Sequence, residues 1–148
     1  MLERVHHPLE TDAPWEDLVI SILSVNQYSL EKTYVHAALL RRSGLFSPED
    51  LSKWGVDEIV ARLKSSGCDR GSFMTKLFAV RLSHLGGAVT SNGISESRRI
   101  LLSNEAEAIR SFLLPINGIG PKVLRNFFLL REIEWNPSHD LMTGGSST

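Results

Sequence analysis

The sequence predicts an all-α protein, organised as a helical bundle or barrel. Residues that commonly begin and end helices divide the chain into segments, and no segment shows the period-two alternation of a β-strand. The 148 residues are 42% hydrophobic and 22% charged, which suits one globular domain with a core of its own. We expect an N-terminal arm over residues 1–13, a helical domain over 14–140 and a disordered tail over 141–148.

The first two helices are predicted from an apolar run and a capping serine. Asp12 is a candidate cap, Pro14 suits an early helical position, and the apolar run that follows reaches Leu23. This helix should be central and buried. Ser29 caps a second helix, which Gly44 ends, and its expected inward stripe is Leu30, Val35, Ala38 and Leu39.

The middle of the chain predicts three more helices. Ser47 is the cap of a short one that has Pro48 in its first turn and ends before Gly55. Another runs from Asp57 to Gly67. A longer one carries its apolar side chains near one side and is expected to end at two consecutive glycines; these residues are Phe73, Leu77, Val80, Leu82, Leu85, Gly86 and Gly87.

The last third predicts a short helix over 96–102 and two helices joined by a tight turn. Asn104 and Glu107 form the expected cap pair of a helix over 105–114, and a second helix covers 121–131. Only the stretch "PINGIG" joins them, and a turn this tight needs glycine at Gly118 and Gly120, for a positive φ or a close backbone approach.

The turn also suggests an anion site. Pro121 fits the first turn of the following helix, where backbone N–H groups point outward and favour a phosphate. A plain corner between two helices that binds nothing explains the glycines equally simply, so the turn alone leaves both interpretations open.

The longer string "LLPINGIGPKV" resembles the helix-hairpin-helix motif of the base-excision DNA glycosylases related to endonuclease III and 8-oxoguanine glycosylase. In that family the hairpin holds a DNA phosphate, sometimes with a monovalent cation on nearby carbonyls. The resemblance implies that the corresponding residues here contact duplex DNA, with the carbonyls of the two isoleucines as cation ligands; these residues are Ile116, Asn117, Gly118, Ile119, Gly120 and Pro121.

Two further residues match the family's catalytic positions. Lys122 stands where bifunctional members carry the lysine that attacks the sugar, and Asp140 follows 18 residues later, as the family's aspartate does. Desolvation and a helix dipole both favour the free amine, which is the nucleophile. The residues around Asp140 depart from the family's usual V-D-T-H, and a polar residue at a frayed terminus is the alternative interpretation.

The resemblance extends to the first helix and to the middle of the chain. "WEDLVISILSVNQYSLEK" resembles the family's first barrel helix and the segment that enters the DNA stack, which implies that Asn26 and Gln27 contact DNA near a flipped base. A capping or turn role for this pair is the alternative. "LKSSGCDRGSFMTKL" resembles a further family segment, although Met74 and Thr75 replace its lysine and alanine.

Composition limits the cofactors and the location of the protein. One cysteine, Cys68, excludes an internal disulfide and any cluster with several thiolate ligands from this chain, so no iron–sulfur cluster or other cofactor is expected. The sequence shows no signal peptide and no membrane span, which favours the cytoplasm. The net charge is −1, but residues 51–100 carry eight basic and four acidic side chains, which permits a basic face.

Three functions remain after these observations. The first is a DNA glycosylase with abasic-site lyase activity on duplex DNA that contains a damaged base or an abasic site. Only eight residues follow Asp140, whereas family members continue with further helices, so the second is a shortened DNA-binding module without catalysis. The third is a helical interaction domain with no role on nucleic acid.

Overall fold

The computed structural model describes residues 13–25 and 29–134, of which 73% are helical, with no strand among them. The all-α prediction is therefore confirmed. None of the helices in these two ranges is both long and apolar enough to cross a membrane. The helices are α1 (Ala13–Leu23), α2 (Leu30–Tyr34), α3 (Ala37–Arg42), α4 (Pro48–Lys53), α5 (Val56–Ser65), α6 (Ser72–Asn92), α7 (Ile94–Leu102), α8 (Ala106–Leu113) and α9 (Pro121–Arg131).

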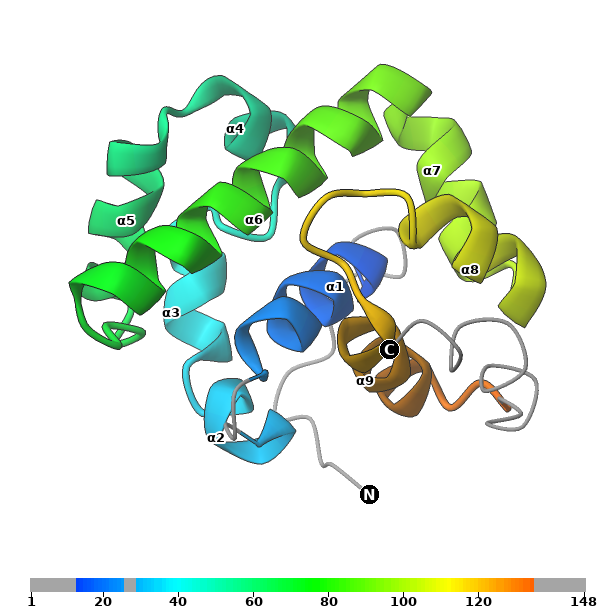
Figure 1. Cartoon of the computed structure of the whole chain (residues 1–148), viewed down its shortest axis with the longest axis horizontal. Coiled ribbons are helices and arrows are strands. Elements are labelled where there is room, and N and C mark those ends of the chain that lie inside the picture. The colour runs from blue at the N-terminus through cyan, green and yellow to red at the C-terminus, as the bar shows by residue number, and fades with distance from the viewer. Residues whose placement is uncertain (1–12, 26–28, 135–148) are drawn as a thin grey trace.

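Helix α1 lies at the centre of the molecule, as its apolar sequence predicts. Figure 1 shows it in the middle of the ribbon, with α6 and α9 among the helices around it. Leu18, Ile20 and Ile22 are fully buried, and every residue from Pro14 to Val25 is buried. Because α1 contacts several of the other helices, it organises the core.

Two predicted serine caps are confirmed. The Ser29 hydroxyl accepts from the backbone N–H of Lys32 at 3.0 Å, and the Ser47 hydroxyl accepts from that of Asp50 at 3.3 Å. Each cap satisfies a backbone donor that a helix start leaves without an intrahelical partner. These caps depend on local sequence alone, which is why the sequence predicts them correctly.

The predicted single helix after Ser29 is wrong, because the chain breaks it into α2 and α3. The backbone N–H of His36 donates to the Thr33 carbonyl at 3.0 Å, which tightens the turn between them. This break turns Ala37 and Leu40 toward the core, whereas Val35 is 78% exposed. Of the predicted inward stripe, Leu30 packs against the core as expected, whereas Val35, Ala38 and Leu39 are exposed.

The predicted end of the long helix at Gly86 and Gly87 is also wrong, since α6 continues to Asn92. A Cβ on Gly86 would lie 2.7 Å from the Leu51 Cβ and 2.8 Å from the Ser52 backbone nitrogen. Gly86 therefore allows α4 to approach α6 closely. The helix ends instead before Gly93, whose φ of +96° suits glycine.

The helices on either side of the turn have nearly the bounds that the sequence predicts, but the predicted cap of the first one does not form. Helix α8 begins at Ala106 after Glu105, which makes no side-chain cap, and Asn104 adopts a φ of +60°. The predicted cap pair of Asn104 and Glu107 is therefore wrong. Helix α9 covers 121–131, as predicted, and α7 begins two residues earlier than expected.

Candidate nucleic-acid interface

The loop over residues 114–120 joins α8 to α9 and is anchored in the core. The side chains of Ile116 and Ile119 are only 9% and 5% exposed. The Ile119 N–H donates to the Ile116 carbonyl at 3.1 Å, which closes a turn within the loop. The two isoleucines therefore stabilise the loop through their side chains, and only their backbone groups are candidates for contact with DNA or a cation.

The two glycines of this loop have different roles. Gly118 has a φ of +99°, and a Cβ there would lie 2.7 Å from the Arg81 Cγ on α6. Gly120 has an extended backbone, with φ −106° and ψ −173°, and no described atom lies within 4 Å of the position of its Cβ. Gly118 therefore needs to be glycine, as predicted. At Gly120 the structure shows neither a positive φ nor a close approach of another described atom, which were the two reasons expected for a glycine there.

The start of α9 presents backbone donors beside an exposed cation. Gly120 is the N-cap and makes no side-chain cap, and Pro121 is the first helical residue. The N–H groups of Lys122 and Val123 lie in the first turn, where a helix offers them no carbonyl and where its dipole favours an anion. The Lys122 side chain is exposed and has no carboxylate partner among residues 13–25 and 29–134.

Helices α1 and α9 run antiparallel, which determines what lies near Lys122. The Asn126 amide donates to the Ser21 carbonyl at 3.2 Å, and Arg131 lies 3.4 Å from the Asp17 carboxylate. One turn before Asn126, the start of α9 therefore lies alongside the carboxyl end of α1, which Val25 follows. Asn26, Gln27 and Asp140, three of the predicted site residues, lie outside the described residues.

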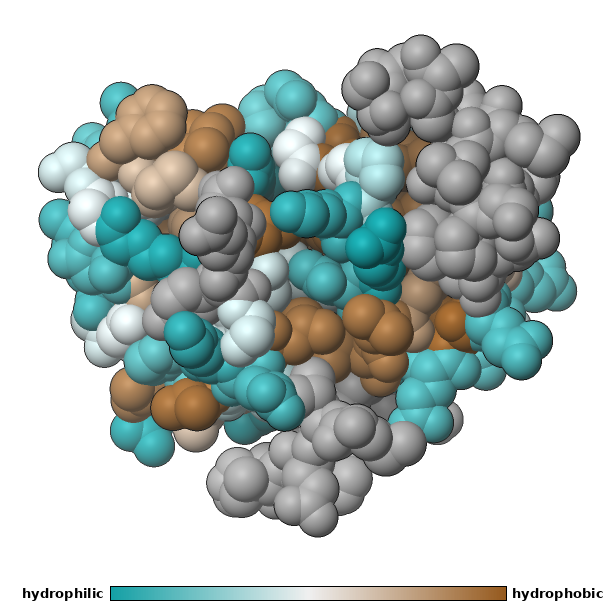
Figure 2. All heavy atoms as spheres, turned by 60° about the horizontal axis from the view of Figure 1, so that its bottom comes forward, coloured by the Kyte–Doolittle hydropathy of each residue, from teal (hydrophilic) through white to brown (hydrophobic). Residues whose placement is uncertain are grey.

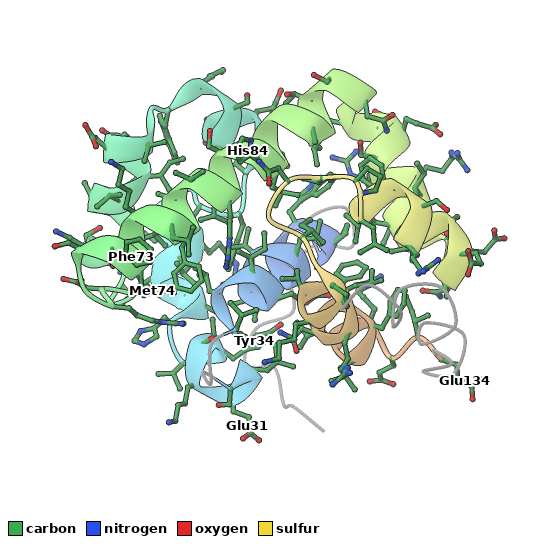
Figure 3. All side chains as sticks on the ribbon, viewed as in Figure 1. Glu31, Tyr34, Phe73, Met74, His84 and Glu134 are labelled. Atoms are coloured by element: carbon green, nitrogen blue, oxygen red, sulfur yellow. The ribbon has the colours of Figure 1, made fainter. Side chains whose placement is uncertain are left out.

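Two side chains of α6 that the sequence analysis missed lie beside the same loop. Arg81 packs against Gly118, and the His84 Nε2 lies 3.4 Å from the Asn117 Nδ2. In Figure 3, His84 stands on α6 next to the loop. A signal was present in the sequence, because residues 72–92 and 108–131 contain six Lys or Arg residues and no Asp or Glu.

The only cysteine has a structural role. Cys68 is 5% exposed, and burial raises the pKa of its thiol, while the nearby Arg70 guanidinium lowers it to a smaller extent. The thiol therefore remains protonated at neutral pH and is a poor nucleophile. Within the described ranges, no three His, Cys, Asp or Glu side chains gather into a group that could hold a metal ion.

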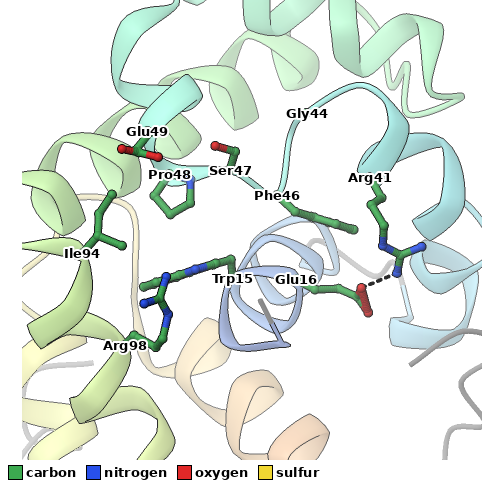
Figure 4. A pocket seen from close by; sticks show the side chains of 10 residues that line it. All are labelled: Trp15, Glu16, Arg41, Gly44, Phe46, Ser47, Pro48, Glu49, Ile94 and Arg98. Atoms are coloured by element: carbon green, nitrogen blue, oxygen red, sulfur yellow. Dashed lines mark hydrogen bonds and ion pairs between the residues drawn. The ribbon is translucent and has the colours of Figure 1, made fainter. Parts of the chain in front are cut away.

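A pocket of about 250 Å³ lies near the start of α1, whereas Lys122 lies beside that helix's carboxyl end. Figure 4 shows Glu16 paired with Arg41 in this pocket, and Trp15 beside Arg98. The Tyr34 hydroxyl also donates to Glu16, at 3.1 Å. The buried charge of Glu16 is therefore balanced within the chain.

Large exposed apolar side chains are dispersed among the helices. Figure 2 shows apolar residues on one face as separate groups between hydrophilic ones. The large apolar side chains exposed on the described part of the chain are Val35, Leu39, Phe73 and Leu129, which lie on or beside α2 and α3, on α6 and on α9. Scattered exposed apolar residues of this kind are normal for a protein surface.

The chain was compared with protein-family models, curated proteins and solved structures. No family model, curated protein or solved structure matches it.

Proposed function

We propose that this protein binds duplex DNA through the α8–α9 loop and the start of α9, in a helix-hairpin-helix arrangement. We further propose that it is a base-excision DNA glycosylase with abasic-site lyase activity, in which Lys122 is the nucleophile. The resemblance of "LLPINGIGPKV" to the glycosylase motif suggests this activity.

The observation that carries the proposal is the antiparallel contact between α1 and α9. It brings the exposed Lys122 and the first-turn N–H groups of α9 to the carboxyl end of α1. The resemblance requires these two segments to meet, because one holds the nucleophile and the other leads into the DNA-inserting residues.

The proposed chemistry uses the Lys122 amine and the sugar of a flipped nucleotide. The amine attacks C1′, the bond between C1′ and the base breaks, and the base leaves with the bonding electrons and takes up a proton, while the attacking nitrogen loses one. At a site that has already lost its base, the amine adds to the open-chain aldehyde and water leaves, which gives an imine. Asp140 is proposed to stabilise the cationic sugar, as its family counterpart does.

One observation favours a second candidate, a DNA-binding module without catalysis. The Lys122 side chain is exposed, and the described part of the chain places no carboxylate beside it that could serve as a base. Backbone donors and an exposed cation are sufficient to hold a phosphate, whereas nucleophilic attack requires the free amine. The two candidates therefore share the binding surface and differ only in the reaction.

Trapping with borohydride tests the nucleophile. The hydride reduces the imine to a stable amine, so the parent protein should become covalently linked to an abasic duplex at low salt. Lys122→Ala should abolish the linked species, because the attacking nitrogen is gone. Lys64→Ala is the matched control, since Lys64 is an exposed helical lysine on α5, and it should be trapped as well as the parent.

The outcomes separate the candidates. If the parent binds the abasic duplex and gives no linked species, the binding module is the correct candidate. If Lys122→Ala is trapped as well as the parent, another amine is the nucleophile. If the parent fails to bind duplex or abasic DNA at low salt, both DNA functions are wrong.

A further inference from the structure

Arg81 is one of the α6 side chains that pack against the α8–α9 loop. Its Cβ and Cγ would lie 3.1 and 2.7 Å from a Cβ on Gly118, so the arginine stem occupies the space that the glycine leaves. The stem is therefore fixed against the loop, while the residue remains partly exposed. This packing holds the arginine stem beside the α8–α9 loop.

The Arg81 guanidinium belongs to a cationic cluster. Its Cζ lies 5.9 Å from the centroid of the buried Phe78 ring, and the Cζ of Arg70 lies 4.8 Å from the same centroid. Arg70 also donates to the Leu23 carbonyl at the end of α1. Two guanidinium groups on one ring produce a local positive potential between α1 and the loop.

The charges of the two guanidiniums are satisfied differently. Arg70 caps the carboxyl end of α1, where a cation is stabilising. Arg81 has no carboxylate partner in the described part of the chain, and α6 itself carries no Asp or Glu. Arg81 is therefore placed to bind an anion from outside the chain.

We propose that Arg81 binds a phosphate of the DNA strand that crosses the α8–α9 loop. This inference rests on the proposed function. Arginine can donate two N–H groups to one phosphate, so Arg81 would add a side-chain contact to those of the α9 backbone. The DNA-binding surface then includes α6 as well as the loop and α9, and it recognises the backbone and not the base sequence.

The salt dependence of binding tests this contact. The probe is an undamaged duplex of mixed sequence, titrated with the full chain between about 50 and 200 mM salt. Arg81→Gln keeps the Cβ and Cγ that pack beside Gly118 and removes the charge. We expect affinity to fall roughly tenfold at low salt and the slope of log K against log salt to become less steep by about 1. The loss should be the same on duplexes of different sequence.

Arg42→Gln is the matched control, because it removes the same charge from an exposed position on α3. It should leave the slope unchanged. Arg81→Lys keeps the charge and should keep most of the slope. If thermal unfolding shows that Arg81→Gln is not folded, Arg81→Met replaces it, because methionine also keeps the packed Cβ and Cγ and removes the charge; a slope equal to that of the parent in Arg81→Met would overturn the contact.

The result separates this inference from the proposed function. If Lys122→Gln reduces the slope while Arg81→Gln matches Arg42→Gln, the Arg81 contact is wrong and DNA binding by the loop remains. If the parent fails to bind the duplex, the proposed function is wrong and the Arg81 contact is wrong with it.

Discussion

The two ends of helix α1 use charged side chains in opposite ways. At its start, Glu16 pairs with Arg41 and Asp17 pairs with Arg131, and both carboxylates are at most 1% exposed. Near its carboxyl end, Arg81 and Lys122 have no carboxylate partner among the described residues. Both ends carry cations, but among the described residues only the start of α1 also supplies the anions.

This difference separates charges that stabilise the fold from charges that are available to a ligand. A buried carboxylate is tolerated only with a partner, so the pairs at the start of α1 are required by the fold. An exposed cation has no such requirement, and its replacement should alter stability little. A variant at the start should therefore reduce stability, and a variant near the carboxyl end should reduce DNA binding.

Asp17→Ala should give the largest effect on stability. It removes the carboxylate from a pair in which Arg131 is only 16% exposed, and so leaves the arginine charge largely buried without this partner. We expect the free energy of unfolding to fall by about 3 kcal/mol. Chemical denaturation with urea measures it, with Lys122→Gln as the control, because Lys122 is exposed and its replacement should change the free energy by less than about 0.5 kcal/mol.

The comparison fails if the two variants lose similar stability. A large loss in Lys122→Gln would mean that this cation supports the fold, and a small loss in Asp17→Ala would mean that the pair at the start of α1 is dispensable.

Gly118→Ala should give the next largest loss of stability, and Gly120→Ala is the control variant in the same loop. Alanine at a φ of +99° is strained, and its methyl group would meet the Arg81 stem, so unfolding should become easier by about 1–2 kcal/mol. Gly120 has an extended backbone and open space, so its alanine variant should be as stable as the parent. Thermal unfolding of both variants measures the difference.

The same two variants also test DNA binding. If the proposed phosphate approaches the start of α9, the methyl group of Gly120→Ala should weaken duplex binding without loss of stability. Binding equal to that of the parent would indicate that no ligand approaches Gly120 closely.

The elements that the sequence predicts correctly depend on neighbours along the chain. The caps of Ser29 and Ser47 each use a backbone N–H three residues ahead, and the burial of α1 follows from its apolar composition. The error at Gly86 arises where a distant helix decides, whereas the error after Ser29 arises at a local turn. Gly86 ends no helix because α4 packs against it, and after the turn at His36 the core-facing residues of α3 are Ala37 and Leu40.

The candidate site could be predicted only in part, for the same reason. The sequence identifies the loop and Lys122 because they lie in one continuous stretch. Arg81 lies 37 residues before Gly118, and only the packing of α6 on the loop brings them together. The absence of acidic residues from 72–92 and 108–131 is the sequence signal that points to these helices.

The smallest expected effect is on the reactivity of the Cys68 thiol, which tests whether solvent reaches the core near Arg70. Burial raises the pKa of the thiol above its ordinary value of 9.0 despite the opposing influence of Arg70. The thiol should therefore react slowly with a thiol-specific reagent in the folded protein and rapidly in denaturant, at the same mildly alkaline pH.

Arg70→Gln should slow the reaction in the folded state further, because the group that lowers the pKa is removed. Since the fold favours the protonated thiol, its contribution to stability is present below the ordinary pKa and is lost as the pH rises above it. Rapid labelling of the folded parent would mean that this part of the core opens to solvent, and the distinction between a closed core and an exposed cationic surface would not hold at this end of α1.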